Sequence, residues 1–206
     1  MNPRPDDIRA RALDDLRRFE VVMQGHFDYG NGFHGALYLN PHQLFRYPST
    51  IWRVAQDLID IVPASLLEQA EFVAGPVTGG ALLAHTIAGL LDGRRALAHP
   101  PYSFAPFGTA AQGHPTLSPF YRRLVKGRRV LLADDVRNTG QTFVQCAALI
   151  EQAGGEIIAT VEIVDRLEAQ MTLEVPNFAL VDYKAPANHP SDACPLCAKG
   201  VPITSF

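Results

Sequence analysis

The stretch from 130 to 142 constrains the fold of this chain more than any other. It begins with four apolar residues, Val130-Leu-Leu-Ala133, the pattern of a strand that is buried on both faces. A short polar turn follows, and residues 143–150 then carry apolar side chains at helical spacing before Gly154-Gly155 ends the helix. A strand that feeds a helix through such a turn predicts an anion site. The N–H groups of the turn converge there, and the helix N-terminus adds roughly half a positive charge.

Two adjacent acids, Asp134 and Asp135, stand between the strand and this turn. Two carboxylates would repel a bare phosphate, so they indicate a ligand that also has sugar hydroxyls to donate or a divalent cation to share. The stretch therefore predicts a phosphorylated sugar bound together with Mg²⁺. The alternative is that the acids only cap the following helix.

A second strand–turn–helix unit lies earlier in the chain. Residues 72–75 predict a short buried strand, 76–80 a Gly-rich turn, and 81–91 a helix of small residues. Two such units in one parallel sheet place both turns at its carboxyl edge, where α/β proteins bind ligands. A ligand with two phosphate groups would span the two turns. The simpler alternative is a tight turn in which glycine supplies a positive φ.

The segment 130–142 resembles the ribose-phosphate-binding signature of type I phosphoribosyltransferases, although Asn138 stands where a Thr is usual. The resemblance makes Asp134 and Asp135 the catalytic pair, which holds the ribose hydroxyls of phosphoribosyl pyrophosphate, with Mg²⁺ held mainly by that ligand. It implies an α/β fold, with a central, mostly parallel sheet flanked by helices and a small hood from the N- and C-terminal segments. The implied 5-phosphate loop is Arg137, Asn138, Thr139, Gly140, Gln141 and Thr142. The implied pyrophosphate loop is Val77, Thr78, Gly79 and Gly80.

Residues 25–40 predict a β-hairpin, because two short aromatic strands flank a Gly-Asn-Gly turn. The segment is similar to the hood of the orotate phosphoribosyltransferase branch, with Asn31 in place of the expected Ser. That resemblance makes Phe27 a candidate for contact with the base. Taken singly, His26 and His34 are expected to be surface or hydrogen-bonded structural histidines.

A predicted strand at 156–164 is followed by Asp165-Arg166-Leu-Glu168. A lone Arg at such a position is normally part of a surface ion pair. The orotate branch carries a similar motif whose Arg pairs with the carboxylate of the base, and a guanidinium fork suits a planar carboxylate. On that resemblance Arg166 is the second base-binding candidate.

Residues 99–119 are rich in Pro and Gly and predict an irregular loop between the two anion turns. The position resembles that of the family's flexible catalytic loop, which supplies a Lys and an acidic–Arg pair. Here no Lys, Arg, Asp or Glu stands between His99 and Tyr121. Three expectations remain open: a neighbouring subunit supplies the cation, turnover is weak or absent, or a cation of this chain takes over. The candidates of the last kind are His114, Arg122 and Arg123.

The tail contains a single Cys-x-x-Cys pair, Cys194 and Cys197. A zinc site generally needs four ligands. His189 would be a third, and nothing nearby in the sequence completes the set. A closely similar tail occurs in one bacterial and archaeal branch of orotate phosphoribosyltransferases, so the pair is interpreted as a branch marker and a redox or metal pair. Cys146, within an apolar helix, is expected in the core.

Further elements complete the predicted organisation. Residues 6–23 and 49–62 predict amphipathic helices, 94–98 a strand and 178–183 the last strand. The predicted segments are 1–62, with the N-terminal helix, hood hairpin and second helix; 63–185, the phosphoribosyltransferase core; and 186–206, the cysteine tail. Together they would form a single structural domain.

The net charge of −3 gives no electrostatic reason to expect nucleic acid or a membrane surface as a partner. No apolar run approaches the roughly 20 residues that span a bilayer, and residues 1–7 lack a signal-peptide core, so the cytoplasm is the expected compartment. Three cysteines, an odd number, do not suggest a secreted disulfide framework. A homodimer is implied by the resemblance alone.

The expected reaction is transfer of the 5-phosphoribosyl group from phosphoribosyl pyrophosphate to a pyrimidine-type base, with orotate as the first choice. The first alternative is a transferase for another base. The second is a non-catalytic sensor that binds phosphoribosyl pyrophosphate but has lost its cationic loop.

Overall fold

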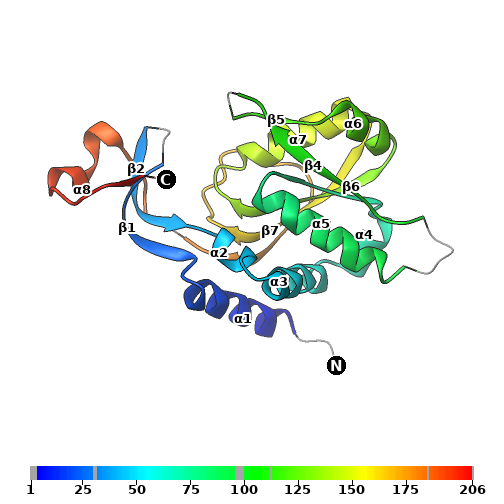
Figure 1. Ribbon diagram of the computed structural model, residues 1–206, viewed down its shortest axis with the longest axis horizontal. Helices are drawn as coiled ribbons and strands as arrows, with labels where there is room; N and C mark the ends of the chain where they lie inside the picture. Colours follow the sequence, from blue (N-terminus) through cyan, green and yellow to red (C-terminus); the bar gives the residue numbers. More distant parts are fainter. Residues whose placement is uncertain (1–3, 30–31, 96–99, 112, 185, 206) are drawn as a thin grey trace.

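A computed structural model describes residues 4–29, 32–95, 100–111, 113–184 and 186–205. These residues form two β-sheets of unequal size, the larger one covered by helices (Figure 1). Within the described residues no helix is long and apolar enough to cross a lipid bilayer.

The larger sheet has the strand order β5-β4-β3-β6-β7-β8. Its strands are β3 (Phe72–Pro76), β4 (Ser103–Thr109), β5 (Pro115–Thr116), β6 (Arg129–Arg137), β7 (Glu156–Asp165) and β8 (Asn177–Asp182). The pairs from β4 through β8 are parallel, whereas the short β5 is antiparallel to β4. The apolar runs at the centre are buried, as expected for a parallel sheet with both faces covered.

Helices cover both faces of this sheet, and the alternation of side chains along β6 shows the two layers. Leu131 and Ala133 pack in the core with helices α1, α3 and α5, whereas Val130 and Leu132 pack with α7. The helices are α1 (Pro5–Arg18), α2 (His42–Phe45), α3 (Pro48–Ile61), α4 (Ala64–Gln69), α5 (Gly79–Asp92), α6 (Pro119–Val125) and α7 (Gln141–Gln152). The predicted α/β core is therefore confirmed.

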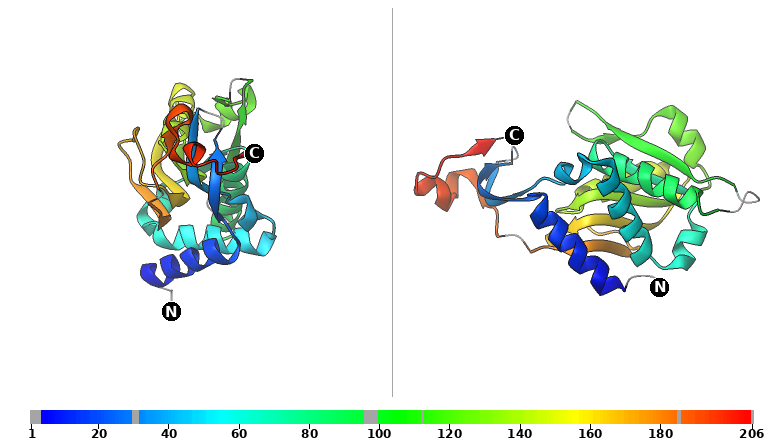
Figure 2. Two further views of the ribbon diagram at one scale, coloured as in Figure 1. Left: turned by 90° about the vertical axis from the view of Figure 1, so that its left-hand side faces the viewer. Right: turned by 60° about the horizontal axis from the view of Figure 1, so that its bottom comes forward.

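The smaller sheet, which we call the hood, has the order β10-β1-β2-β9. Its strands are β1 (Val22–Asp28), β2 (Phe33–Leu39), β9 (His189–Pro190) and β10 (Thr204–Ser205), and the tail between β9 and β10 holds the 3-10 turn η1 (Ser191–Ala193) and α8 (Pro195–Ala198). Figure 2 shows the hood to one side of the larger sheet. It is built from the N- and C-terminal segments, as predicted.

Two predicted elements have different limits. The N-terminal helix ends at Arg18 rather than at residue 23, because Glu20 takes a positive φ of 53° and the chain turns into β1. The predicted irregular loop contains β4 beside β3 and also β5. Pro106 is tolerated in β4 because β5 pairs only with Gly108 and Thr109, which leaves Pro106 on an open edge.

Other predicted helices and strands are found close to their expected positions. Helix 49–62 corresponds to α3, and strands 72–75, 156–164 and 178–183 correspond to β3, β7 and β8. Residues 94 and 95 of the expected strand form a turn, and residues 96–98 of it lie outside the described residues. Strands flank the predicted hairpin turn, of which Gly30 and Asn31 also lie outside the described residues.

Candidate active site

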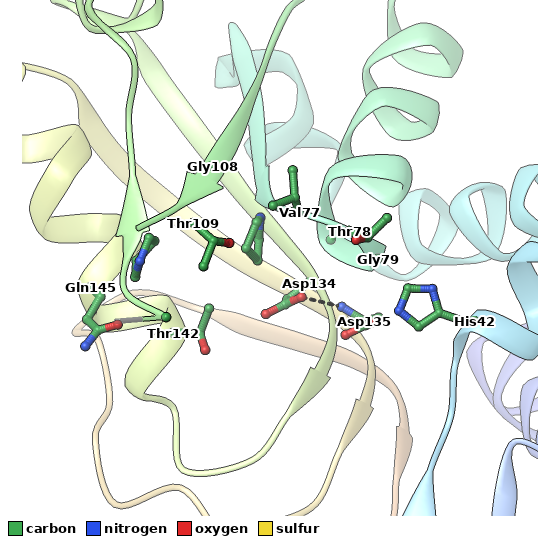
Figure 3. Close-up of a pocket in the computed structure, with 14 residues that line it drawn as sticks. His42, Val77, Thr78, Gly79, Gly108, Thr109, Asp134, Asp135, Thr142 and Gln145 are labelled. Atoms are coloured by element: carbon green, nitrogen blue, oxygen red, sulfur yellow. Dashed lines mark hydrogen bonds between the residues drawn. The ribbon is translucent and has the colours of Figure 1, made fainter. Parts of the chain in front are cut away.

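Two adjoining cavities open at the carboxyl ends of β3 and β6. The smaller, of about 320 Å³, lies between the 76–80 turn, Gly108-Thr109 and the acidic pair (Figure 3). The larger, of about 860 Å³, extends from the acidic pair along the 137–142 loop to the hood. Both cavities are lined by His42, Gly113, Asp134, Asp135, Thr142 and Gln145, so they form one continuous site. A ligand with two phosphate groups and a base has room to span it.

The acidic pair lies within β6 rather than after it, since the ladder with β7 continues to Arg137. Each acid accepts a hydrogen bond from the next backbone N–H: Asp134 from Asp135 N at 2.9 Å and Asp135 from Val136 N at 2.8 Å. Burial and then the charge of Asp135 raise the pKa of Asp134 well above its usual value. Burial also raises the pKa of Asp135, although the nearby His42 opposes that shift. Neither acid caps the following helix through a side-chain hydrogen bond.

The turn at 76–80 comes closer to the acids than a side chain would allow. A Cβ on Gly79 would stand 2.0 Å from Asp135 Oδ2, and one on Gly80 would stand 2.7 Å from Asp134 Oδ1. The peptide bond between Val77 and Thr78 is cis. Gly79 and Gly80 begin α5, so the N-terminus of a 14-residue helix faces the smaller cavity. The simpler alternative, a turn in which glycine supplies a positive φ, does not apply to Gly79 and Gly80, because close approach to the acids requires these glycines instead.

The 137–142 loop lines the larger cavity throughout. Gly140 has a φ of +81° and precedes α7, so the loop also ends at a helix N-terminus. Thr139 and Thr142 are exposed toward the cavity, as an anion ligand requires. Arg137 is only 6% exposed, and its Nε has no hydrogen-bond partner among the described residues.

Arg166 follows β7 and lines the same cavity. Its guanidinium donates to Asn138 Oδ1 at 3.3 Å, to Glu168 Oε1 at 3.1 Å and to Asn188 Oδ1 at 3.5 Å. The residue is 7% exposed, and its Nε has no partner among the described residues. A nearly buried guanidinium in the wall of a cavity is suited to an anionic ligand group.

The hood contributes one wall of the larger cavity, next to Arg166. Asp28, Tyr29 and Tyr38 line the larger cavity, whereas Phe27 is 3% exposed and packs against the Tyr38 ring at 5.7 Å. Phe27 therefore lies behind the wall that its neighbours form. Burial raises the pKa of Tyr29, and the adjacent Arg166 opposes this.

The predicted cations are divided between the site and the surface. His114 lines the larger cavity, 3.3 Å from Gln145 Nε2 through its Nδ1. Arg122 and Arg123 lie exposed on α6 and are not among the residues that line either cavity. His42 lines both cavities beside Asp135 (Figure 3), and no sequence motif indicated it.

A model of the phosphoribosyl transferase domain matches residues 56–178. The chain therefore belongs to the phosphoribosyl transferase family. Within it, an orotate phosphoribosyltransferase of Novosphingobium aromaticivorans is 31% identical over 193 residues, which cover 93% of each chain.

Solved structures of the family share this fold. The orotate phosphoribosyltransferase from Aeropyrum pernix is similar with a TM-score of 0.64 and 22% identity, over 83% of this chain and 93% of that one. The adenine phosphoribosyltransferase from Saccharomyces cerevisiae, solved with adenine, has a TM-score of 0.62 and 18% identity, over 84% of this chain and 99% of that one. The predicted type I phosphoribosyltransferase fold is confirmed, and a fold shared by enzymes named for different bases does not itself select the base.

Proposed function

We propose that this chain is an orotate phosphoribosyltransferase, which transfers the 5-phosphoribosyl group of phosphoribosyl pyrophosphate to orotate and releases pyrophosphate. The observation that carries the choice of base is Arg166, a nearly buried cation in the wall of the larger cavity. Orotate differs from uracil by one carboxylate, the group that a guanidinium binds in a bidentate manner. The name and length of the curated relative agree with this choice.

The reaction needs no protein nucleophile. As pyrophosphate leaves, C1 of the ribose gains positive charge, so positioning and electrostatics supply the rate enhancement. Asp134 and Asp135 accept from the ribose hydroxyls and place negative charge near C1. The 137–142 loop binds the 5-phosphate, and the turn at 77–80 binds pyrophosphate with the N-terminus of α5.

The acidic pair also fits Mg²⁺. Each carboxylate uses Oδ1 to accept a backbone N–H, so Oδ2 remains for a hard cation, which prefers oxygen ligands. When bound, Mg²⁺ would lower the negative charge of the departing pyrophosphate and offset the repulsion within the pair. His42 and His114 are the proposed sources of further positive charge, in place of the absent lysines.

The proposed assembly is a homodimer in the cytoplasm. A partner subunit would add a cation to a site whose own loop has none between residues 100 and 121 except His114. The described cysteines are all free, which suits a reducing compartment. Sedimentation at micromolar concentration measures the assembly directly.

An assay of pyrophosphate release tests the proposal. The purified chain receives phosphoribosyl pyrophosphate and Mg²⁺, with orotate, with uracil, with purine bases, or with no base. Release that depends on orotate, together with orotidine 5-phosphate as product, is expected. Release with another base would reassign the acceptor, and release without any base would indicate hydrolysis.

A sensor is the second candidate, because the 100–121 segment carries no Lys or Arg. Binding of phosphoribosyl pyrophosphate in calorimetry, with no product from any base, would support the sensor and exclude the transferase.

Replacement of the acidic pair tests the assigned roles. Asp134→Asn combined with Asp135→Asn should lower kcat/KM at least about 100-fold, because both ribose acceptors lose their charge. The melting temperature should hold or rise, since burial raises the pKa of both acids and their charged forms oppose folding. Asp182→Asn, an exposed acid at the end of β8, is the control. Unchanged turnover in the double variant would remove Asp134 and Asp135 from the mechanism.

A further inference from the structure

Four potential metal ligands meet in the hood, far from one another in sequence. They are His26 on β1, His34 on β2, Cys194 just before α8 and Cys197 within α8. One ligand atom from each lies within 4.8 Å of all the others. His26, His34 and Cys194 are buried, at 2%, 7% and 3% exposed. The hood and α8 are seen together at the left of Figure 1.

The separations between these atoms match the edges of a coordination tetrahedron. His26 Nε2 lies 3.3 Å from His34 Nδ1, 3.5 Å from Cys194 Sγ and 3.7 Å from Cys197 Sγ, and His34 Nδ1 lies 3.3 Å from Cys197 Sγ. Zinc bonds of about 2.0 Å to nitrogen and 2.3 Å to sulfur give tetrahedron edges of about 3.3 to 3.8 Å. Four of the six separations therefore match a zinc tetrahedron, and the other two are no longer than 4.8 Å.

Hydrogen bonds within the cluster do not explain this arrangement. His26 Nδ1 donates to the carbonyl of Val201 at 2.8 Å, and because a carbonyl only accepts, this nitrogen carries the proton of the neutral ring. His26 Nε2 then has one lone pair, directed at His34 and both cysteines. One lone pair cannot accept from three neighbours, whereas one cation satisfies all four atoms.

The surroundings of both rings are those of metal-bound histidines. Such rings usually direct their second nitrogen at a carbonyl or a carboxylate. His26 uses the Val201 carbonyl in this way, and His34 Nε2 lies 4.0 Å from Asp28 Oδ1. His189, the third ligand expected from sequence, pairs with His34 through the backbone of β9 and is not a member of the cluster.

We propose that His26, His34, Cys194 and Cys197 bind one structural Zn²⁺. Two nitrogens and two thiolates suit zinc, and four protein ligands leave no open position for catalysis. The expectation that both histidines are merely structural or exposed is replaced by a ligand role. The cysteine pair alone indicated a metal only weakly, because both histidines lie at least 160 residues earlier in the chain.

The zinc would join the hairpin to the tail. The two outer strands of the hood, β9 and β10, have only two residues each. A sheet this small needs a further link to be stable. Asp28 and Tyr29, which follow His26 closely, and Ser205 of β10 all line the larger cavity. Metal binding would therefore fix one wall of the site described above without touching the reacting atoms.

Metal analysis of the full chain tests the proposal. Protein purified from zinc-supplemented cells should hold about one zinc per chain by mass spectrometry. Exchange for Co²⁺ should give the strong visible absorption of tetrahedral cobalt and a thiolate-to-cobalt charge-transfer band. Absence of bound zinc together with absence of these bands after reconstitution would overturn the site. So would a Cys194–Cys197 disulfide in freshly purified protein, seen as a loss of two free thiols.

Matched variants locate the metal. Cys194→Ser and His26→Asn should lose the zinc. After reconstitution with Co²⁺, the bands of the Cys194→Ser protein should be weaker than those of the wild-type protein, even if the hood of the variant is partly unfolded. Cys146→Ala, in the core, and His189→Asn, in the hood, should retain one zinc. Full zinc occupancy in both Cys194→Ser and His26→Asn, or its loss from the His189→Asn control, would contradict the assignment of ligands.

Discussion

Arg166 shows how much a single side chain decides in this site. Its Nη atoms are held by Asn138, Glu168 and Asn188, so the guanidinium plane is fixed before any ligand binds. The neighbouring Glu168 carboxylate compensates part of the charge, and the buried Nε has no hydrogen-bond partner among the described residues. An arginine fixed in this way can discriminate a base with a carboxylate from one without it, because the alternative is a buried donor left unpaired.

Arg166→Lys keeps the charge but removes the fork. The KM for orotate should rise roughly 10- to 100-fold, since a hydrogen bond to a charged group contributes about 1.5–3 kcal/mol. The KM for phosphoribosyl pyrophosphate should change little, which steady-state kinetics with each substrate varied in turn will measure. Arg122→Lys, on the exposed face of α6, is the matched control. An unchanged KM for orotate would exclude Arg166 as the residue that reads the base.

Residue roles were accessible from sequence only where spacing fixes them. Asp134 and Asp135 follow the apolar run of β6 and Arg166 follows β7, and parallel strands bring their carboxyl ends to one edge. His42 carried no such signal, since a four-residue helix after the hairpin places it at the cavity. His26 and His34 are buried and hydrogen-bonded, one of the two outcomes expected for them, but their proximity to Cys194 and Cys197 had no sequence signal because the cysteines come from the far end of the chain.

At the scale of one element, the turn between β3 and α5 depends on glycine for its close contact with the neighbouring strand. Its glycines let the backbone pass against the acidic side chains of the neighbouring strand β6. The 76–80 turn and the acidic pair, the proposed pyrophosphate and ribose sites, are therefore in direct contact with each other. A helix glycine further along α5, Gly89, has open space around its Cβ position.

Gly79→Ala should displace Asp135, because the added Cβ would stand 2.0 Å from Asp135 Oδ2. Affinity for phosphoribosyl pyrophosphate, measured by calorimetry, should fall at least about tenfold, the equivalent of 1.4 kcal/mol. Gly89→Ala is the control in the same helix and should raise stability by about 0.5–1 kcal/mol with affinity unchanged. Equal affinity in the two variants would show that the close contact at Gly79 has no part in binding.

Helices and strands whose apolar residues recur with a clear period were predicted well, whereas strands that are defined only by hydrogen bonding to a neighbouring strand were not. Helix α3 and strands β3, β7 and β8 match their apolar patterns. Strand β4 was missed because the segment 99–119 around it is rich in Pro and Gly, although Ala105 and Phe107 are buried in the core. Strands β9 and β10 have two residues each, too few for any pattern.

At the scale of the whole molecule, ionisation of buried acids couples stability to pH. Glu162 is fully buried in β7, accepts from Asn177 Nδ2 at 2.7 Å, and burial raises its pKa to about 7. Below pH about 4.5 the Glu162 carboxyl is protonated in both the native and the unfolded protein, so its ionisation does not change the free energy of unfolding. As the pH rises toward 7, the unfolded chain releases this proton before the native protein does. The free energy of unfolding must therefore decrease across that interval.

Glu162→Gln should reduce this dependence. Between pH 5 and pH 8, ionisation of Glu162 should lower the free energy of unfolding of the wild-type protein by up to about 3 kcal/mol. The free energy of unfolding of the variant should fall correspondingly less. Urea denaturation at both pH values measures the difference. Glu156→Gln, exposed at the start of the same strand, should behave as wild type. A pH dependence unchanged by Glu162→Gln would show that this carboxyl does not govern it.

The hood also sets an order in which the molecule can be completed. His26 Nδ1 and the carbonyl of Val201 are separated by 175 residues along the chain, and β10 pairs with β1 over a similar span. During synthesis on the ribosome, β3 to β8 and the two turns proposed to bind phosphate emerge before the tail that closes the hood. Nascent chains should therefore acquire phosphate binding first and the base-side wall last. A chain halted before residue 189 should hold the sugar phosphate while its acceptor end is still open to water.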